Sequence, residues 1–282
     1  MNYLYLSPHP DDAVLSCGGL IHRQRCAGDS VAVLTLCAGQ PDYSRLSPMA
    51  LQLHAQWGNT PDLVGARRTE DQRVLTSLGA AAFYGHTPDA LYRRVGDEIA
   101  YPDSSSLFSA PHPQELNSLP PLWRQQVEGL GFPREQVTVI APLAVSKHVD
   151  HQLARALVLL LIQGGWQVWF YEDFHRAQWS SEAVQTARAW FGPVTWQSRT
   201  VLIDVEVKIT AIRGYTTQVP ALFGSDPRMA EHVKRYTADA ACAVDWVERV
   251  RRALAGTGGR RERLWRALLG YHAHAERIWT WA

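Results

Sequence analysis

The pattern that most constrains the fold is a strand, a helix and a second strand at the start of the chain. Residues 3–6 form a short apolar run that stops at a Ser-Pro pair, as a buried strand does. Residues 13–26 can form a helix, and residues 31–36 form a second, β-branched run that stops at an Ala-Gly pair. This spacing predicts a βαβ unit with parallel strands. We therefore expect an α/β fold around a parallel sheet.

The rest of the chain continues this alternation and then becomes mainly helical. Strands are predicted at residues 80–84, 137–140 and 168–171, with an extended edge segment at 195–205. Helices are predicted at residues 66–78, 151–163, 181–190, 206–219, 227–252 and 261–269. A surface loop with a short helix is expected at residues 40–65, and a second long loop at the proline-rich residues 85–121. A loop of that length is usually a lid, a rim or an oligomer contact.

Composition limits the class of protein. The 282 residues suffice for one large domain or two small ones, and the net charge of +1 gives no bulk field that favours nucleic acid or an anionic membrane. No apolar stretch reaches the roughly 18 residues of a membrane span, and we expect no signal peptide at the N-terminus. The four cysteines form no CxxC pair, which is typical of reduced, buried thiols. We expect a cytoplasmic protein that binds no nucleic acid; whether it forms a homo-oligomer stays open.

The strongest chemical signal is the string SPHPDD at residues 7–12, between the first predicted strand and the first predicted helix. Ligands bind at the carboxyl ends of the strands in open α/β sheets, so this is the expected functional edge. Asp11 and Asp12 are adjacent and repel each other unless a cation or hydrogen-bond donors neutralise them. Asp12 could instead cap the helix that starts near residue 13. Because His9 lies beside the two carboxylates, we favour a metal site.

A second cluster, HVDH at residues 148–151, follows the strand predicted at 137–140 and opens a helix. It places further imidazole and carboxylate groups at a carboxyl edge of the same sheet. Zinc sites for hydrolysis typically use three protein ligands and keep one position for water. His9, Asp12 and His151 meet that need.

Three side chains of the two clusters are left over by this choice. Asp11 and His148 are then free for proton transfer. Asp150 is expected to accept a hydrogen bond from a histidine ring and fix its tautomer. As an N-terminal carboxylate it could equally stabilise the helix dipole, and the two roles are compatible.

Together these strings resemble the LmbE-like, or PIG-L, family of zinc-dependent N-acetylglucosaminyl deacetylases. The family's first motif, (A/S)HPDD(E/A), is similar to residues 8–13, and its second, HxDH, to residues 148–151. Further similarities cover nearly the whole chain: RxxE at residues 67–70, YED at 171–173, KxxAIxxYxSQ at 208–218 and ExxW at 276–279. Departures from the family pattern are Ala13 for Glu, His175 for Pro or Tyr, and Thr217 for Ser.

The resemblance implies an architecture. It implies a Rossmann-like three-layer sandwich with a mostly parallel central sheet, plus a C-terminal helical and extended region. The chain would be a single domain over residues 1–282, with the core at 1–170 and a substrate-shaping part at 171–282.

The resemblance also implies roles at the two clusters. His9, Asp12 and His151 would be the zinc ligands, although ferrous iron suits the same donors. Asp11 would be the general base, and His148 the transition-state stabiliser or general acid. The residues alone do not decide whether Asp11 or His148 protonates the leaving amine.

The implied substrate is an N-acetylated sugar or glycoconjugate, from which the enzyme would release acetate and a free amine. Arg67, or Arg68 as the fallback, and Asp89 would bind sugar hydroxyls through charge-assisted hydrogen bonds. Without the resemblance, the arginines are typical of a solvated helix face and Asp89 of a turn. The alternative function is a catalytically inactive sugar-binding or regulatory homologue, but Asp11 and His148 are both present and binding alone needs neither. A nucleotide-binding enzyme is disfavoured because no GxGxxG or GxxxxGK[ST] string follows a strand.

Overall fold

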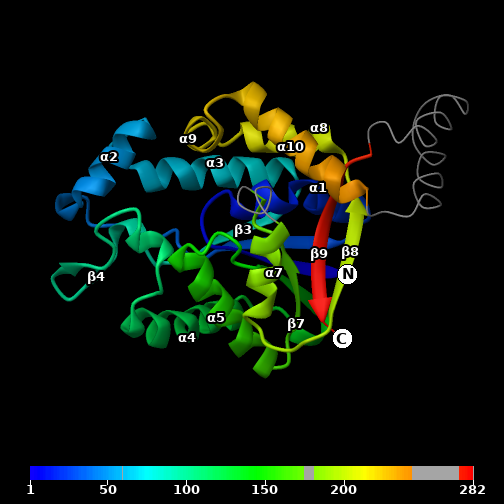
Figure 1. Cartoon of the computed structure of the whole chain (residues 1–282), viewed down its shortest axis with the longest axis horizontal. Helices are drawn as coiled ribbons and strands as arrows, with labels where there is room; N and C mark the ends of the chain where they lie inside the picture. Colours follow the sequence, from blue (N-terminus) through cyan, green and yellow to red (C-terminus); the bar gives the residue numbers. More distant parts are fainter. Residues whose placement is uncertain (59, 175–180, 243–272, 282) are drawn as a thin grey trace, which may run out of the picture.

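A mixed sheet of seven strands forms the middle layer of the computed structural model, which describes residues 1–58, 60–174, 181–242 and 273–281 (Figure 1). The strand order across this described part of the chain is β3-β2-β1-β6-β7-β9-β8. The strands are β1 (Asn2–Ser7), β2 (Ser30–Thr35), β3 (Ala81–Tyr84), β6 (Val137–Pro142), β7 (Gln167–Tyr171), β8 (Trp196–Leu202) and β9 (Ala275–Trp281). Five neighbouring strands, β3, β2, β1, β6 and β7, run parallel to one another, and β9 is antiparallel to both β7 and β8.

Strands β1 and β6 lie side by side at the centre of the sheet and run in the same direction. Tyr5 of β1 is in register with Ile140 of β6. Both strands are almost entirely buried, as expected for parallel strands with helices on both faces. Because parallel strands end at the same edge, the segments that follow Ser7 and Pro142 leave the sheet next to each other.

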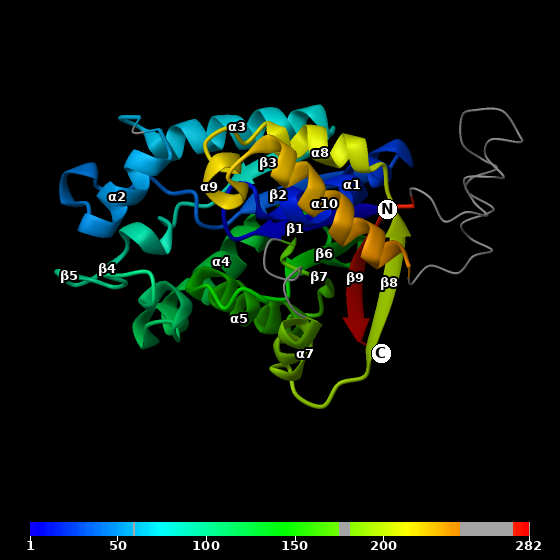
Figure 2. The ribbon, with the colours of Figure 1, turned by 45° about the horizontal axis from the view of Figure 1, so that its top comes forward.

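Helices cover both faces of the sheet and complete three layers (Figure 2). One face carries α1 (Asp12–Cys26), α3 (Leu63–Ser77), α8 (Val205–Arg213) and α10 (Asp226–Ala241), which share one apolar core with the sheet. The other carries α4 (Pro113–Gly129), α5 (Val149–Gln163) and α7 (Ser181–Ala189), which share a second core. The expected α/β sandwich with a mostly parallel sheet is therefore confirmed.

Shorter elements surround the carboxyl edge of the sheet. They are α2 (Pro48–Gln56), α9 (Val219–Phe223), the β4 (Arg94–Val95) and β5 (Glu98–Ile99) hairpin, and the single turns η1 (Tyr43–Arg45), η2 (Ala90–Tyr92) and η3 (Ser106–Phe108). A further single turn, η4 (Arg134–Gln136), directly precedes β6 and lies at the opposite edge. Helix α2 confirms the short helix predicted within residues 40–65. None of the helices in the described ranges has the length and apolar character that crossing a membrane requires.

The long loop predicted over residues 85–121 is wrong at its C-terminal end, because α4 begins there. Pro113 stands in the first turn of α4, where a missing backbone N–H costs nothing. Two further prolines at residues 120–121 lie inside the helix, where they remove backbone hydrogen bonds. Trp123 is nevertheless completely buried in the core. Tertiary packing therefore outweighs the local preference against a helix.

The C-terminal part of the chain supplies two strands of the sheet. The extended edge segment predicted at residues 195–205 is confirmed as β8, whereas β9 was not predicted as a strand. The helix predicted at 261–269 and the end of the one at 227–252 lie outside the described residues. All four cysteines are free, but Cys26 and Cys242 are exposed, so the expectation of buried thiols is wrong for these two.

A completely buried ion pair joins β9 to α8 and α1. The Lys208 ammonium lies 2.6 Å from the Glu276 carboxylate and donates to the Ser16 carbonyl oxygen at 2.9 Å. Helix α1 is kinked at Cys17, which has φ −128° and ψ 16°. Just after the kink, Glu276 accepts hydrogen bonds from the backbone amides of residues 19–20. The Lys208–Glu276 pair therefore supplies hydrogen-bond partners for backbone groups at the kink of α1, and the candidate site lies at the start of this helix.

We expect Lys208→Met to lower the free energy of unfolding by about 3–5 kcal/mol, because it leaves the Glu276 charge buried without a cation. Urea denaturation measures the change. Lys234→Met is the matched control, because the Lys234–Glu206 pair is largely exposed and contributes little. Equal stability losses in the two variants would contradict the structural role of the buried pair.

Candidate active site

The turn that follows β1 is fixed by Ser7 and contains strained backbone at Asp11. The Ser7 hydroxyl donates to the His9 carbonyl oxygen at 2.6 Å and accepts from the Ala13 amide at 3.0 Å. Asp11 has φ 121° and ψ −38°, a backbone conformation that residues other than glycine rarely adopt. Such strain persists only where the surroundings enforce it, and it clusters at functional sites.

The turn between β6 and α5 is strained as well. Ala144 and Lys147 have φ of 61° and 58°. His148 follows and caps α5, because its Nδ1 accepts the Asp150 amide at 3.2 Å. An accepting Nδ1 makes this ring a neutral imidazole with its proton on Nε2. Burial, followed by the neighbouring charge of His9, lowers the pKa of His148 to about 4, which agrees with that state.

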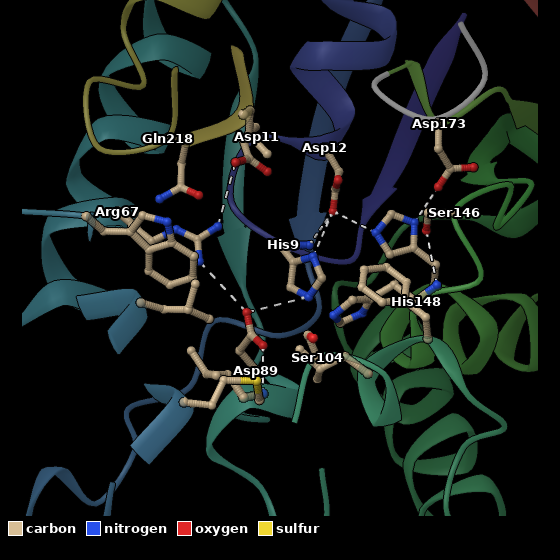
Figure 3. Close-up of a pocket in the computed structure, with 18 of the residues that line it drawn as sticks. His9, Asp11, Asp12, Arg67, Asp89, Ser104, Ser146, His148, Asp173 and Gln218 are labelled. Carbon is tan, nitrogen blue, oxygen red and sulfur yellow. Dashed lines mark hydrogen bonds and ion pairs between the residues drawn. The ribbon is translucent and has the colours of Figure 1, made fainter. Parts of the chain in front are cut away.

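Three nitrogen and oxygen donors from the two turns converge at the sheet edge (Figure 3). His9 Nδ1 lies 3.1 Å and His151 Nε2 lies 3.3 Å from the same oxygen of Asp12. The three donor atoms lie within 4.8 Å of one another, which suits coordination of one metal ion. Asp12 does not cap α1: the N-cap position belongs to Asp11, whose side chain makes no capping hydrogen bond. The structure therefore brings together the three side chains that the sequence nominated as ligands.

Each imidazole of this cluster has a carboxylate on its far nitrogen. His9 Nε2 lies 3.0 Å from Asp150 Oδ2, and His151 Nδ1 is hydrogen-bonded to Asp173. A ring nitrogen that donates to a carboxylate leaves the other nitrogen as the free donor atom for a cation. The two carboxylates therefore select the tautomers that point His9 Nδ1 and His151 Nε2 at Asp12.

The carboxylate of Asp150 is itself held by a buried network. It is hydrogen-bonded to the Arg93 guanidinium and accepts the Ala90 amide at 3.0 Å. The same guanidinium donates two bonds, of 2.7 and 2.9 Å, to Glu115 in α4. Arg93 therefore ties the segment between β3 and α4 to the helix that carries His151.

Electrostatics within the cluster favour positive charge at its centre. Burial alone would lower the pKa of both imidazoles, but the surrounding carboxylates raise the pKa of His9 well above its ordinary value and that of His151 to about 10. Burial likewise raises the pKa of Asp12, but the neighbouring His151 and His9 outweigh it and hold that pKa well below its usual range. Carboxylates that retain protons on two buried imidazoles mark a place that also attracts a metal cation.

Asp11, Arg67 and Asp89 lie beside the cluster. The Arg67 guanidinium is 3.6 Å from the Asp11 carboxylate and 3.8 Å from that of Asp89. The Asp89 carboxylate also lies 3.6 Å from His9 Nε2. Burial, and then the charge of Asp12, raise the pKa of Asp11 to about 8, so this carboxyl can hold and release a proton near neutral pH.

A cavity of about 640 Å³ opens onto these side chains. Of the residues nominated from the sequence, those that line it are His9, Asp11, Asp12, Arg67, Asp89, His148 and His151. Asp150 lies behind His9 and is completely buried. The guanidinium of Arg68 packs on the Tyr84 ring, with 4.8 Å between Cζ and the ring centroid, and does not line this cavity. Of the two alternative arginines, the structure thus brings only Arg67 to the pocket.

Three residues at the site had no role assigned from the sequence. Asp173 and Arg93 hold His151 and Asp150, and Gln218 lines the pocket near Arg67 and Asp11 (Figure 3). Asp173 and Gln218 lie in the YED and KxxAIxxYxSQ strings noted above, which is the one signal that could have marked them.

Within the described residues, a second set of donors overlaps the first at His9. Atoms of His9, Asp89, His148 and Asp150 also lie within 4.8 Å of one another. In this second set, Asp150 is already neutralised by Arg93 and the Nδ1 of His148 caps α5. In the first set, the Asp12 carboxylate accepts the His9 backbone amide at 2.8 Å but pairs with no arginine or lysine of the described residues, so it is the better cation site.

Comparisons with known proteins agree with this geometry. The family model described as PIG-L, GlcNAc-PI de-N-acetylase, matches residues 4–162. A 2'-N-acetylparomamine deacetylase of Niallia circulans is 30% identical over 239 residues, which cover 79% of this chain and 83% of that protein. A 2'-N-acetylparomamine deacetylase of Streptomyces fradiae is 28% identical over 224 residues, which cover 76% of this chain and 72% of that protein.

The fold also matches a solved structure, the zinc-inhibited form of a teicoplanin deacetylase. The TM-score is 0.76 at 22% sequence identity, over 100% of this chain and 99% of that one. At this identity the match establishes the shared fold.

We expect Arg93→Met to lower the free energy of unfolding by about 3–5 kcal/mol, because it leaves two buried carboxylates without their cation. Arg93→Lys restores the charge but not the forked geometry and should recover part of the loss. Chemical denaturation measures both variants, with the half-exposed Arg45→Met as the control. A loss no greater than that of the control would show that Arg93 does not hold the site together.

Proposed function

The chain belongs to the PIG-L (LmbE-like) family of deacetylases, and from that premise we propose that it is a metal-dependent enzyme that hydrolyses the N-acetyl amide of an amino sugar. The products are acetate and a free amine on the sugar. One observation carries the proposal: His9, Asp12 and His151 converge on one point, with Asp11 and His148 beside them in the same pocket. The acetylparomamine deacetylases among its relatives support an N-acetylated sugar conjugate as the substrate class.

The donor set fits a divalent metal ion. Two imidazole nitrogens and one carboxylate oxygen are the ligand types that zinc takes in hydrolases, and ferrous iron accepts the same set. The carboxylates of Asp150 and Asp173 orient the imidazole rings of His9 and His151 through hydrogen bonds to the other ring nitrogens. His9, Asp12 and His151 would hold a divalent cation, which would supply Lewis-acid activation of the amide and would lower the pKa of water beside it. We propose zinc as this cation.

Two side chains of the pocket carry the proton chemistry. Asp11 takes a proton from the attacking water as general base, and the same carboxyl then returns it to the leaving amine. His148 is the second group: its neutral ring presents Nε2–H as a hydrogen-bond donor for the oxygen of the amide carbonyl as negative charge develops there. The neutral imidazole of His148 is too weak an acid to protonate the leaving amine, so Asp11 is the better general acid.

The sugar is positioned by the groups next to the cluster. Arg67 and Asp89 offer a cation and a carboxylate for hydrogen bonds with sugar hydroxyls. Gln218 adds a neutral amide at the same wall. This residue and Phe174 come from the C-terminal part, which supports the proposal of a single domain, residues 1–282, whose C-terminal part at 171–282 shapes the substrate pocket.

Zinc binding should release about two protons at pH 7, because the carboxylates raise the pKa of both ligand imidazoles and coordination displaces a proton from each. The apparent affinity should therefore fall as pH is lowered. Titration calorimetry in buffers of different ionisation enthalpy measures the release. We expect Asp173→Asn to weaken binding by about 10–100-fold through loss of the carboxylate behind His151. Zinc binding without proton release, or unaffected by Asp173→Asn, would contradict this site.

We expect Asp11→Asn to lower kcat by about 10²–10⁴-fold while the protein keeps its metal, because Asp11 moves the proton but is not among the ligands. Acetate release from N-acetylglucosaminides and metal content measured on the same sample test this. Chelation of the wild-type protein should abolish turnover. Substrate binding without acetate release at any metal loading would favour the inactive sugar-binding homologue, and chelator-insensitive turnover would refute the metal requirement.

A further inference from the structure

The outer half of the active-site pocket is apolar. The charged groups gather at the cation cluster and at Arg67 and Asp89, apart from the exposed Asp103. Beyond that pair, the lining comes mainly from α2 and from the segment around η3, and its apolar members are Met49, Leu53, Trp57, Leu91, Leu107 and Phe108. Met49, Leu53 and Trp57 are half-buried, and Phe108 is 39% exposed. Partly exposed apolar side chains gathered around one cavity mark a binding surface.

This apolar half adjoins the groups proposed to hold the sugar. The Trp57 ring lies against Arg67, with 5.2 Å between the ring centroid and Cζ. Leu91 follows Asp89 by two positions, and its amide donates to the Asp89 carboxylate at 3.0 Å. The cavity of about 640 Å³ thus continues from the cation cluster past the sugar-binding pair to the apolar wall.

We propose that the substrate carries an apolar aglycone, which this outer half of the pocket binds; the inference rests on the proposed function. The polar groups that line the outer half are Gln52, Asp103 and Ser104, all of them exposed at the rim. A hydroxyl-rich or amine-rich aglycone would place polar groups against Met49 and Leu53 without partners, which is unfavourable. An apolar aglycone instead removes its own surface and that of the wall from water.

A long acyl chain on the amide nitrogen would share this chemistry, but its position fits less well. The amide must lie between Asp11 and His148 at the cation cluster for its carbonyl to react. Trp57 and Leu91 of the apolar wall adjoin Arg67 and Asp89, the residues proposed to bind the sugar ring, whereas Phe108 lies against His148 with 5.5 Å between the ring centroids. A group that reaches Trp57 and Leu91 therefore leaves the substrate from the ring.

Four probes separate these sources: the methyl and hexyl glycosides of N-acetylglucosamine, free N-acetylglucosamine, and N-hexanoylglucosamine. We expect kcat/KM for amine release to be at least about tenfold higher for the hexyl than for the methyl glycoside, because the added methylenes are buried. N-hexanoylglucosamine should gain nothing over N-acetylglucosamine. Equal kcat/KM for the two glycosides overturns the inference, as does a preference for the hexanoyl amide instead.

Helix α2 offers a matched pair of variants. Leu53 lines the pocket, whereas Leu51 on the same helix is 57% exposed and does not line it. Leu53→Asn should bring the hexyl-to-methyl ratio of kcat/KM close to one. Leu51→Asn should leave both kcat/KM values unchanged. The inference is overturned when Leu53→Asn keeps the ratio or when both variants lower it equally.

Equilibrium binding distinguishes failure of this inference from failure of the proposed function. If no N-acetylated probe releases an amine, the deacetylase proposal is wrong. Calorimetric titration of the two glycosides into the Asp11→Asn protein then decides the aglycone separately. Binding of the hexyl glycoside at least about tenfold tighter than the methyl glycoside supports the apolar site, and equal affinities overturn it.

Discussion

The parallel pairing of β1 with β6 is the constraint on which the site depends. It places the turn after Ser7 beside the turn after Pro142, although the two segments are more than a hundred residues apart in the sequence. Both turns contain strained backbone, at Asp11 and Lys147, and one carboxylate and two imidazoles lie close together where they meet at the sheet edge. The buried Lys208–Glu276 pair stabilises the kink in α1 from behind, so the C-terminal strand also contributes to holding the N-terminal turn.

The charges of the site form a chain of alternating sign. Glu115 pairs with Arg93, Arg93 with Asp150, Asp150 with the His9 ring, and that ring with Asp12. A shorter chain runs from Asp173 through His151 to the same Asp12 oxygen. Buried charges are stable only when each is matched by a partner. Both chains of charges end at the Asp12 carboxylate. A cation bound to that carboxylate therefore continues the alternation of sign.

Local patterns in the sequence predict most of the strands and the candidate ligands. They fail where contacts between distant segments determine the structure. The buried parallel strands and the HPDD and HVDH strings at their ends are local features, and they suffice to nominate His9, Asp12 and His151 as ligands. Asp150 was expected to orient a histidine ring, but the pattern did not say which one. The partners of Asp173 and Arg93 lie 22 and 57 residues away along the chain, so only tertiary packing reveals those contacts. The same holds for β9, whose neighbours β7 and β8 precede it by many residues, and for α4, whose internal prolines argued against a helix.

Membership in a deacetylase family and the converging donors together make cation binding between His9, Asp12 and His151 the central claim. A crystal structure of the zinc-loaded protein, with anomalous data collected on both sides of the zinc absorption edge, tests it most directly. We expect one strong peak with His9 Nδ1, His151 Nε2 and an Asp12 oxygen at about 2.0–2.2 Å. A peak between His9 Nε2, Asp89 and His148, or no peak at the sheet edge at all, would contradict it.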